Sequence, residues 1–138
     1  MTTFVDTSVL IDILQPNAQH HQWSTDELKR AKENGPVVVS DMVYSEFSVA
    51  IPSKAEVDEV IKKLDLYRCG YDENVLFGAG KAYAKYRARA GEGAKKNVLP
   101  DFFIGALANH EESPLITRDP QKVHAYFPNV KLITPNLS

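Results

Sequence analysis

The 138-residue sequence has one cysteine, no long hydrophobic run and no excess of positive charge. A lone Cys69 cannot form an internal disulfide, which excludes disulfide-rich secreted domains and favours a reducing compartment. We expect its thiol to be buried on a strand, because it ends the run Leu66-Tyr67-Arg68-Cys69. No apolar stretch reaches the ~18 residues of a membrane-spanning helix, and the N-terminus lacks the basic segment of a signal peptide. We therefore expect a cytoplasmic protein with no membrane association.

The charge balance excludes a further class of protein. Sixteen Lys and Arg against eighteen Asp and Glu give a net charge of −2. This argues against a protein that coats nucleic acid through net positive charge, but leaves local binding open, because the distribution of charge matters more than its sum. With 43% hydrophobic and 25% charged residues, the composition is typical of a globular domain, and we expect one domain over residues 1–138.

Short apolar runs alternate with helical patterns along the chain, and this alternation predicts an α/β fold with a parallel sheet. The expected strands cover residues 3–6, 37–40, 66–69, 115–117 and 131–134. The expected helices cover residues 7–14, 20–33, 42–51, 54–64, 73–90, 101–110 and 120–126. The helix over 101–110 is apolar nearly all round, which predicts that it is buried.

Acidic residues gather where strands end and helices begin. Asp6 ends the first expected strand, Asp119 follows the fourth, and Asp101 opens a helix, so all three belong at the carboxyl edge of a parallel sheet. Each also has a structural interpretation: Asp6 and Asp119 as helix N-caps, and Asp101 as a partner of the helix dipole. Glu46 borders the apolar face of its helix, and a carboxylate turned towards a core is costly unless it is paired or bound to a cation.

Two other acids near this edge are left out of the predicted site. Asp12 lies off the apolar face of its helix, so we expect it to be solvated. Asp41 precedes the expected helix over 42–51 and suits an N-cap.

Four acids at one sheet edge would repel one another unless a divalent cation binds between them. Hard oxygen ligands suit Mg²⁺ or Mn²⁺, which keep several water molecules and need only a few carboxylates. Such a site can activate water and stabilise the charge that develops on a phosphodiester during in-line displacement. The residues alone leave open whether one or two ions bind.

Four segments that contain these acids resemble the acidic motifs of the PIN domain, and especially those of VapC-type toxins of bacterial and archaeal toxin–antitoxin pairs. The segments are Val5–Asp12, Tyr44–Phe47, Leu99–Ala106 and Leu115–Pro120. Each motif alone is weakly specific, but four in order at fitting separations form a strong signal. The resemblance extends from Thr2 to about Pro135 and implies a five-stranded parallel sheet flanked by helices.

The resemblance also implies an activity, partners and site residues. It implies a Mg²⁺- or Mn²⁺-dependent endoribonuclease that is usually a homodimer, is held inactive by a VapB-type antitoxin, and leaves 5′-phosphate and 3′-hydroxyl ends. By match to the motifs, the acidic and metal-binding residues would be Asp6, Glu46, Asp101 and Asp119, with Asp6 and Asp101 foremost as direct ligands. Supporting groups that orient carboxylates or water would be Thr7, Ser8 and Thr117.

A basic segment leads into the third acidic motif and could hold the RNA backbone. Between residues 81 and 96 there are six cations and one acid, Glu92. The candidate RNA-binding residues are Lys81, Lys85, Arg89, Lys95 and Lys96, together with Arg118 beside the fourth acid. The alternative interpretation of the segment is a solvated helix face. We expect an apolar groove for an antitoxin helix near the helices over 42–51 and 54–64.

Two other function classes remain as alternatives. A haloacid dehalogenase-like phosphatase also begins with a strand followed by Asp, but it usually needs a second Asp two residues later, where this chain has Ser8. A non-catalytic protein, either a phosphoreceiver or a PIN scaffold that only binds a partner, is the other alternative. An inactive scaffold would normally lack one of the acids, and none is missing here.

Overall fold

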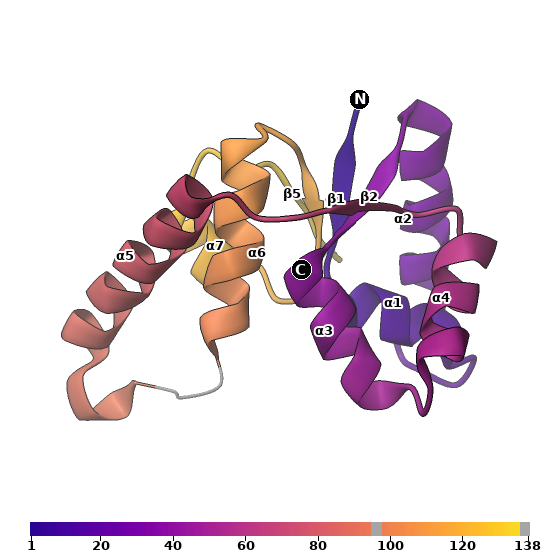
Figure 1. The fold of residues 1–138 in the computed structure, drawn as a ribbon, viewed down its shortest axis with the longest axis horizontal. Helices are drawn as coiled ribbons and strands as arrows, with labels where there is room; N and C mark the ends of the chain where they lie inside the picture. Colours follow the sequence, from indigo (N-terminus) through magenta and orange to yellow (C-terminus); the bar gives the residue numbers. More distant parts are fainter. Residues whose placement is uncertain (95–97, 136–138) are drawn as a thin grey trace.

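The computed structural model describes residues 1–94 and 98–135. Five parallel strands form one sheet in the order β3-β2-β1-β4-β5, with helices on both sides (Figure 1). The strands are β1 (Thr3–Val5), β2 (Val37–Ser40), β3 (Tyr67–Cys69), β4 (Leu115–Ile116) and β5 (Leu132–Ile133). Each expected strand is confirmed to within one residue at either end, and the α/β parallel fold is confirmed with them.

The helices also follow the predicted pattern, to within two residues at either end. They are α1 (Thr7–Leu14), α2 (His21–Asn34), α3 (Asp41–Ala50), α4 (Lys54–Lys63), α5 (Glu73–Ala90), α6 (Leu99–His110) and α7 (Gln121–Tyr126), with a short 3₁₀ turn η1 (Gly91–Gly93) after α5. In Figure 1, α5, α6 and α7 are grouped at one end of the molecule and α1, α2 and α4 at the other.

The central strand β1 is paired on both sides, which explains why its residues are almost all apolar. Phe4 is in register with Val38 of β2 and with Leu115 of β4. Thr3, Phe4 and Val5 are all buried. The residue that follows β1 therefore lies at the middle of the sheet's carboxyl edge, between the ends of β2 and β4.

Helix α6 is buried, as its apolar surface predicted, and it holds α5 and α7 together. Phe102 is 1% exposed, and its ring packs against those of Tyr83 and Tyr86 from α5 and Tyr126 from α7. Gly105 allows α7 to approach closely, because a Cβ at this position would lie 2.7 Å from Cδ2 of Phe127. This packing fixes the first turn of α6 relative to the sheet.

Two local predictions are wrong, both next to the edge strand β3. Cys69 is half-buried rather than buried, because β3 has a neighbour on one side only and Tyr67 is 58% exposed. Asp41 does not cap α3. The helix begins one residue earlier than expected, Ser40 Oγ accepts the hydrogen bond from the Val43 N–H at 3.1 Å, and Asp41 instead pairs with Arg68 at 2.6 Å.

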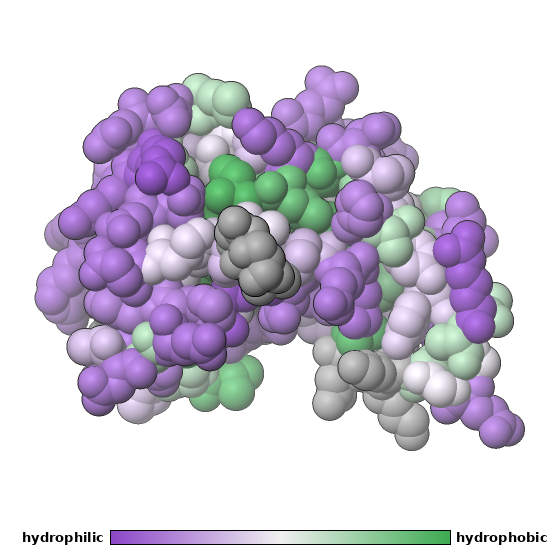
Figure 2. Space-filling model, turned by 180° about the vertical axis from the view of Figure 1, so that it is seen from behind, coloured by the Kyte–Doolittle hydropathy of each residue, from purple (hydrophilic) through white to green (hydrophobic). Residues whose placement is uncertain are grey.

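The surface carries no sign of a membrane-spanning element in the part of the chain that the structure describes. None of its helices is both long enough and apolar enough to cross a bilayer. The face seen in Figure 2 is largely hydrophilic, and a small hydrophobic patch interrupts it near the centre.

Candidate active site

Asp6 lies at the centre of the sheet's carboxyl edge and is held there by two hydrogen bonds. Its Oδ1 accepts the Thr7 backbone N–H at 2.7 Å, so the carboxylate caps α1. Its Oδ2 accepts the hydroxyl of Thr117, which follows β4, at 2.6 Å. The residue is therefore both a helix cap and the point where β1, α1 and the end of β4 meet.

Glu46 comes to the same edge on the second turn of α3. Its carboxylate is half-buried, and Oε1 accepts the hydroxyl of Thr7 at 2.8 Å. Thr7 thus donates its backbone N–H to Asp6 and its side chain to Glu46. This pair of bonds sets the spacing of the two carboxylates.

Thr117 and Asp119 complete the β4 side of the edge. Thr117 is fully buried, and its hydroxyl oxygen accepts the Asp119 backbone N–H at 3.0 Å while the hydroxyl donates to Asp6. The N-cap interpretation of Asp119 is wrong, because Pro120 occupies the cap position and α7 starts one residue later. Asp119 is exposed, so its carboxylate is open to solvent.

Asp101 enters the site from the buried helix α6. The helix begins at Leu99, with Pro100 next, so Asp101 lies in its first turn, where a negative charge complements the helix dipole. Ser8 lies in the first turn of α1, and its hydroxyl oxygen is buried with no hydrogen-bond partner among the described residues.

The pKa values of two of these acids, Asp101 and Asp6, are raised in the folded protein. Burial, and after it the charge of Asp6, raises the pKa of Asp101 to about 6, with smaller contributions from Glu46 and Asp119. Burial also raises the pKa of Asp6, and the charges of Glu46 and Asp119 add to this, although the hydrogen bonds from Thr117 and Thr7 oppose it. A titratable group in such surroundings is a candidate functional group.

Lys122 is a site residue that sequence reasoning missed. It lies in the first turn of α7, is half-buried, and its charge lowers the pKa of Asp101 against the larger effects that raise it. Its Nζ lies 6.0 Å from the centre of the Tyr86 ring on α5. The signal was its place three residues after the fourth acid, which puts a cation at the same sheet edge.

The donor set fits a hydrated divalent ion. Among residues 1–94 and 98–135, no three His, Cys, Asp or Glu side chains converge closely enough to form a metal cage on their own. Mg²⁺ does not need one, because it usually binds through one or two carboxylates and keeps the rest of its shell as water. The mutual repulsion of the carboxylates and the orphaned Ser8 hydroxyl both suit an ion with bound water at this edge.

The predicted RNA-binding residues fall into three groups. Lys81, Lys85 and Arg89 are exposed along α5, whereas Lys95 and Lys96 lie outside the described residues. Arg118 is not free, because it forms an ion pair with Asp12 at 2.6 Å.

The prediction for Asp12 is therefore wrong. The residue is 3% exposed rather than solvated, because α1 packs on α2 and Ser24 donates a hydrogen bond to its carboxylate. The apolar periodicity of α1 describes that helix alone, so it could not predict the contact between Asp12 and Ser24 of α2.

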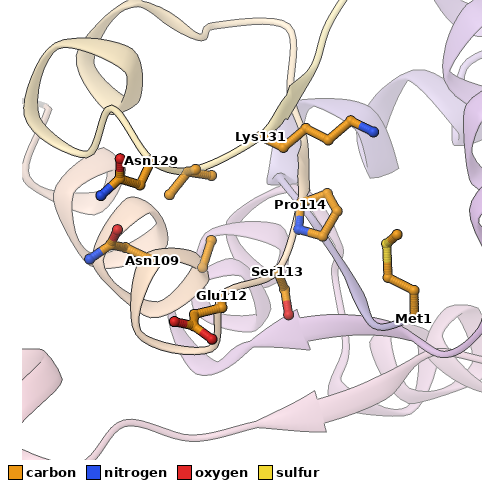
Figure 3. Close-up of a pocket in the computed structure, with 9 residues that line it drawn as sticks. Met1, Asn109, Glu112, Ser113, Pro114, Asn129 and Lys131 are labelled. Atoms are coloured by element: carbon orange, nitrogen blue, oxygen red, sulfur yellow. The ribbon is translucent and has the colours of Figure 1, made fainter.

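A cavity of about 620 Å³ lies away from these acids (Figure 3). Its lining includes Pro114, which precedes β4, and Lys131, which precedes β5, so it lies at the amino edge of the sheet. Glu112 and Ser113 also line it, but none of the four acids of the carboxyl edge does. The cavity is therefore separate from the candidate active site.

Comparison with known proteins fits this geometry. The family model of the PIN domain matches residues 3–127, which is most of the chain. The chain belongs to the PIN-domain family. No curated protein sequence matches this PIN domain significantly.

Solved structures similar to this PIN domain include several toxin–antitoxin complexes. A chain of VapBC2 from Rickettsia felis, bound to a promoter DNA fragment, is 15% identical with a TM-score of 0.66, and the match covers 99% of this chain and 100% of that one. A chain of VapBC-1 from nontypeable Haemophilus influenzae is 16% identical with a TM-score of 0.67, covering 97% and 98%. A Klebsiella pneumoniae toxin–antitoxin complex is 21% identical with a TM-score of 0.64, covering 96% and 97%. At these identities the similarity establishes the fold.

Proposed function

We propose that this PIN domain is a divalent-metal-dependent endoribonuclease that acts as the toxin of a toxin–antitoxin pair in the cytoplasm. The observation that carries the proposal is the electrostatic coupling of the carboxylates of Asp6, Glu46, Asp101 and Asp119 at one sheet edge. Such a cluster is unfavourable by itself, and cation binding relieves it. We assign Asp6 and Asp101 as the main metal ligands, with Mg²⁺ as the metal and Mn²⁺ as an effective substitute.

The residues of the chain have distinct parts in this chemistry. A divalent ion bound here would supply an activated water and neutralise the charge that develops on the phosphodiester. Thr7 and Thr117 fix the carboxylates of Glu46 and Asp6 through hydrogen bonds of 2.8 and 2.6 Å. A carboxylate of this cluster would help to accept the proton of the attacking water. Lys122, the cation that offsets part of the charge on Asp101, is placed to contact a phosphate oxygen.

The RNA would approach along the basic side of α5. Lys81, Lys85 and Arg89 are exposed on successive turns of this helix. The guanidinium of Arg89 lies 5.5 Å from the centre of the Tyr126 ring on α7, and Lys122 lies one turn earlier on α7. We propose that this row of cations holds the backbone phosphates, and we include Lys95 and Lys96 in it on sequence grounds alone.

The partners of the proposed toxin are a VapB-type antitoxin and a second copy of the chain. The similar folds in VapBC complexes support the first of these. An apolar depression of about 350 Å³ beside α3 and α4 suits an antitoxin helix, and its lining includes Leu14, Ile51, Pro52 and Val60. Val49, on the last turn of α3, is 89% exposed.

The experiment that tests the activity is cleavage of single-stranded RNA by the purified protein. We expect internal cuts that leave 5′-phosphate and 3′-hydroxyl ends in Mg²⁺ or Mn²⁺, no cuts in EDTA, and recovery when metal is added back. A phosphomonoester substrate run in parallel tests the phosphatase alternative. Cleavage that persists in EDTA, or release of phosphate from the monoester without RNA cleavage, would contradict the proposal.

A further inference from the structure

An ion pair between the buried carboxylate of Asp12 and the half-buried side chain of Arg118 joins α1 to the segment that follows β4. Asp12, on the second turn of α1, is 3% exposed, and its Oδ2 lies 2.6 Å from Nε of Arg118. The contact is ionic, since the Nε–H has no hydrogen-bond partner within residues 1–94 and 98–135. The same Oδ2 accepts the hydroxyl of Ser24 from α2 at 2.9 Å, and Ser24 is fully buried.

The pair lies next to the acids without belonging to them. Arg118 stands between Thr117, whose hydroxyl donates to Asp6, and Asp119, whose N–H donates to Thr117. The segment 117–119 is thus attached to α1 at two places: at the helix start through Asp6 and at the second turn through Asp12.

Stability alone does not explain such a pair. Burying the carboxylate of Asp12 costs free energy that its attraction to Arg118 has to offset, and an ion pair taken out of water often adds no net stability. What the pair provides is a preferred position for Arg118, because the buried carboxylate of Asp12 is strongly unfavourable without a cation beside it. The arrangement fixed here is the path of residues 117–119, which carry two of the groups of the proposed active site.

We propose that Asp12 is a positioning residue. Its ion pair with Arg118 holds the segment 117–119 so that Thr117 and Asp119 lie beside the other acids of the cluster. Arg118 then anchors the loop, and its charge is already neutralised by Asp12 rather than offered to an RNA phosphate. This inference rests on the proposed function, and it reverses the sequence-based prediction that Arg118 contacts RNA.

The test compares the wild type with Asp12→Asn, Arg118→Gln and the double variant. Calorimetric titration with Mn²⁺ in the absence of RNA measures metal affinity, and thermal melting measures folding. We expect all three variants to bind Mn²⁺ about tenfold more weakly, as other supporting groups of metal sites do, with no additivity in the double variant. Arg118→Gln should lower the melting temperature most, because it leaves the buried carboxylate of Asp12 unpaired, and the double variant should recover that loss.

RNA binding in EDTA tests whether Arg118 positions the segment 117–119 or contacts an RNA phosphate. We expect the slope of log affinity against log salt to be unchanged in all three variants, since each phosphate contact on single-stranded RNA contributes about 0.7 to it. The matched control is Lys54→Gln with Asp58→Asn, an exposed ion pair on α4, which should leave the affinity for Mn²⁺ unchanged.

Two results would overturn the inference. One is a folded double variant with wild-type Mn²⁺ affinity. The other is a slope that falls by about 0.7 in Arg118→Gln but not in Asp12→Asn, which would identify Arg118 as a phosphate contact. A wild type that binds no Mn²⁺ contradicts the proposed function itself, and the inference falls with it.

Discussion

At the scale of single residues, Asp101 shows most clearly how burial and neighbouring acids raise a pKa in this cluster. Its folded pKa of about 6 lies above the ordinary value of 3.8, so the folded protein binds more protons than the unfolded chain between these values. Without metal, the contribution of Asp101 to the free energy of unfolding therefore falls as the pH rises from about 4 to about 6, and it stays low at higher pH. The raised pKa is caused first by burial and then by the charge of Asp6.

Asp101→Asn should therefore stabilise the metal-free protein at pH 7.5 by roughly 1 kcal/mol, a value reduced for the partial exposure of the carboxyl group. The difference from the wild type should be much smaller at pH 4, where the carboxyl group of Asp101 is neutral in the folded protein. Urea unfolding in EDTA at the two pH values measures it. Equal stability of the two proteins at pH 7.5 would mean that the folded protein does not raise the pKa of Asp101.

The hydroxyl of Thr117 is the second residue-scale determinant. Thr117→Val keeps the shape but removes the donor to Asp6 and the acceptor for the Asp119 N–H. The pKa of Asp6 should rise further, and Mn²⁺ affinity should fall about ten- to hundredfold. Thr117→Ser keeps the hydroxyl and should stay close to the wild type in the same titration. Weak Mn²⁺ binding by Thr117→Ser, or wild-type Mn²⁺ binding by Thr117→Val, would contradict this role.

At the scale of elements, the contact between α6 and α7 decides where Asp101 and Lys122 stand. A Cβ at Gly105 would approach Phe127 to 2.7 Å, whereas a Cβ at Gly78 of α5 meets nothing within 4 Å. Gly78→Ala should stabilise the protein by about 0.5–1 kcal/mol through helix propensity. Gly105→Ala has the same gain but adds an overpacking cost of about 1–3 kcal/mol. Denaturant unfolding of both variants should rank Gly105→Ala as the less stable, and the reverse order would contradict the close approach of α7.

How far the sequence predicts the molecule also depends on the element. The strands and helices were predictable because apolar periodicity is local, and the place of Asp6 at the sheet edge followed from where its strand ends. The pairing of Asp12 with Arg118 joins residues more than 100 positions apart in the sequence, and no local pattern contains it. Lys122 has a local signal in its place three residues after Asp119, but its relation to Asp101 depends on how α7 packs against α6.

At the scale of the whole molecule, the net charge of −2 combines an acidic sheet edge with a basic helix. Replacing Lys81, Lys85 and Arg89 with Gln should weaken RNA binding in EDTA and reduce the slope of log affinity against log salt by about 2. The matched control replaces Lys29, Lys62 and Lys63 with Gln, which removes equal charge from α2 and α4. Equal losses in both triple variants would mean that RNA responds to total charge rather than to α5.

The central claim is that the four acids form one cation-binding hydrolytic site, and calorimetric titration with Mn²⁺ tests it most directly. The account predicts saturable binding to the wild type, loss of binding in Asp6→Asn and in Asp101→Asn, and loss of RNA cleavage in the same two variants. Asp26→Asn, a matched change at an exposed acid of α2, should bind and cleave as the wild type does. Wild-type Mn²⁺ binding and cleavage in both site variants would contradict the account.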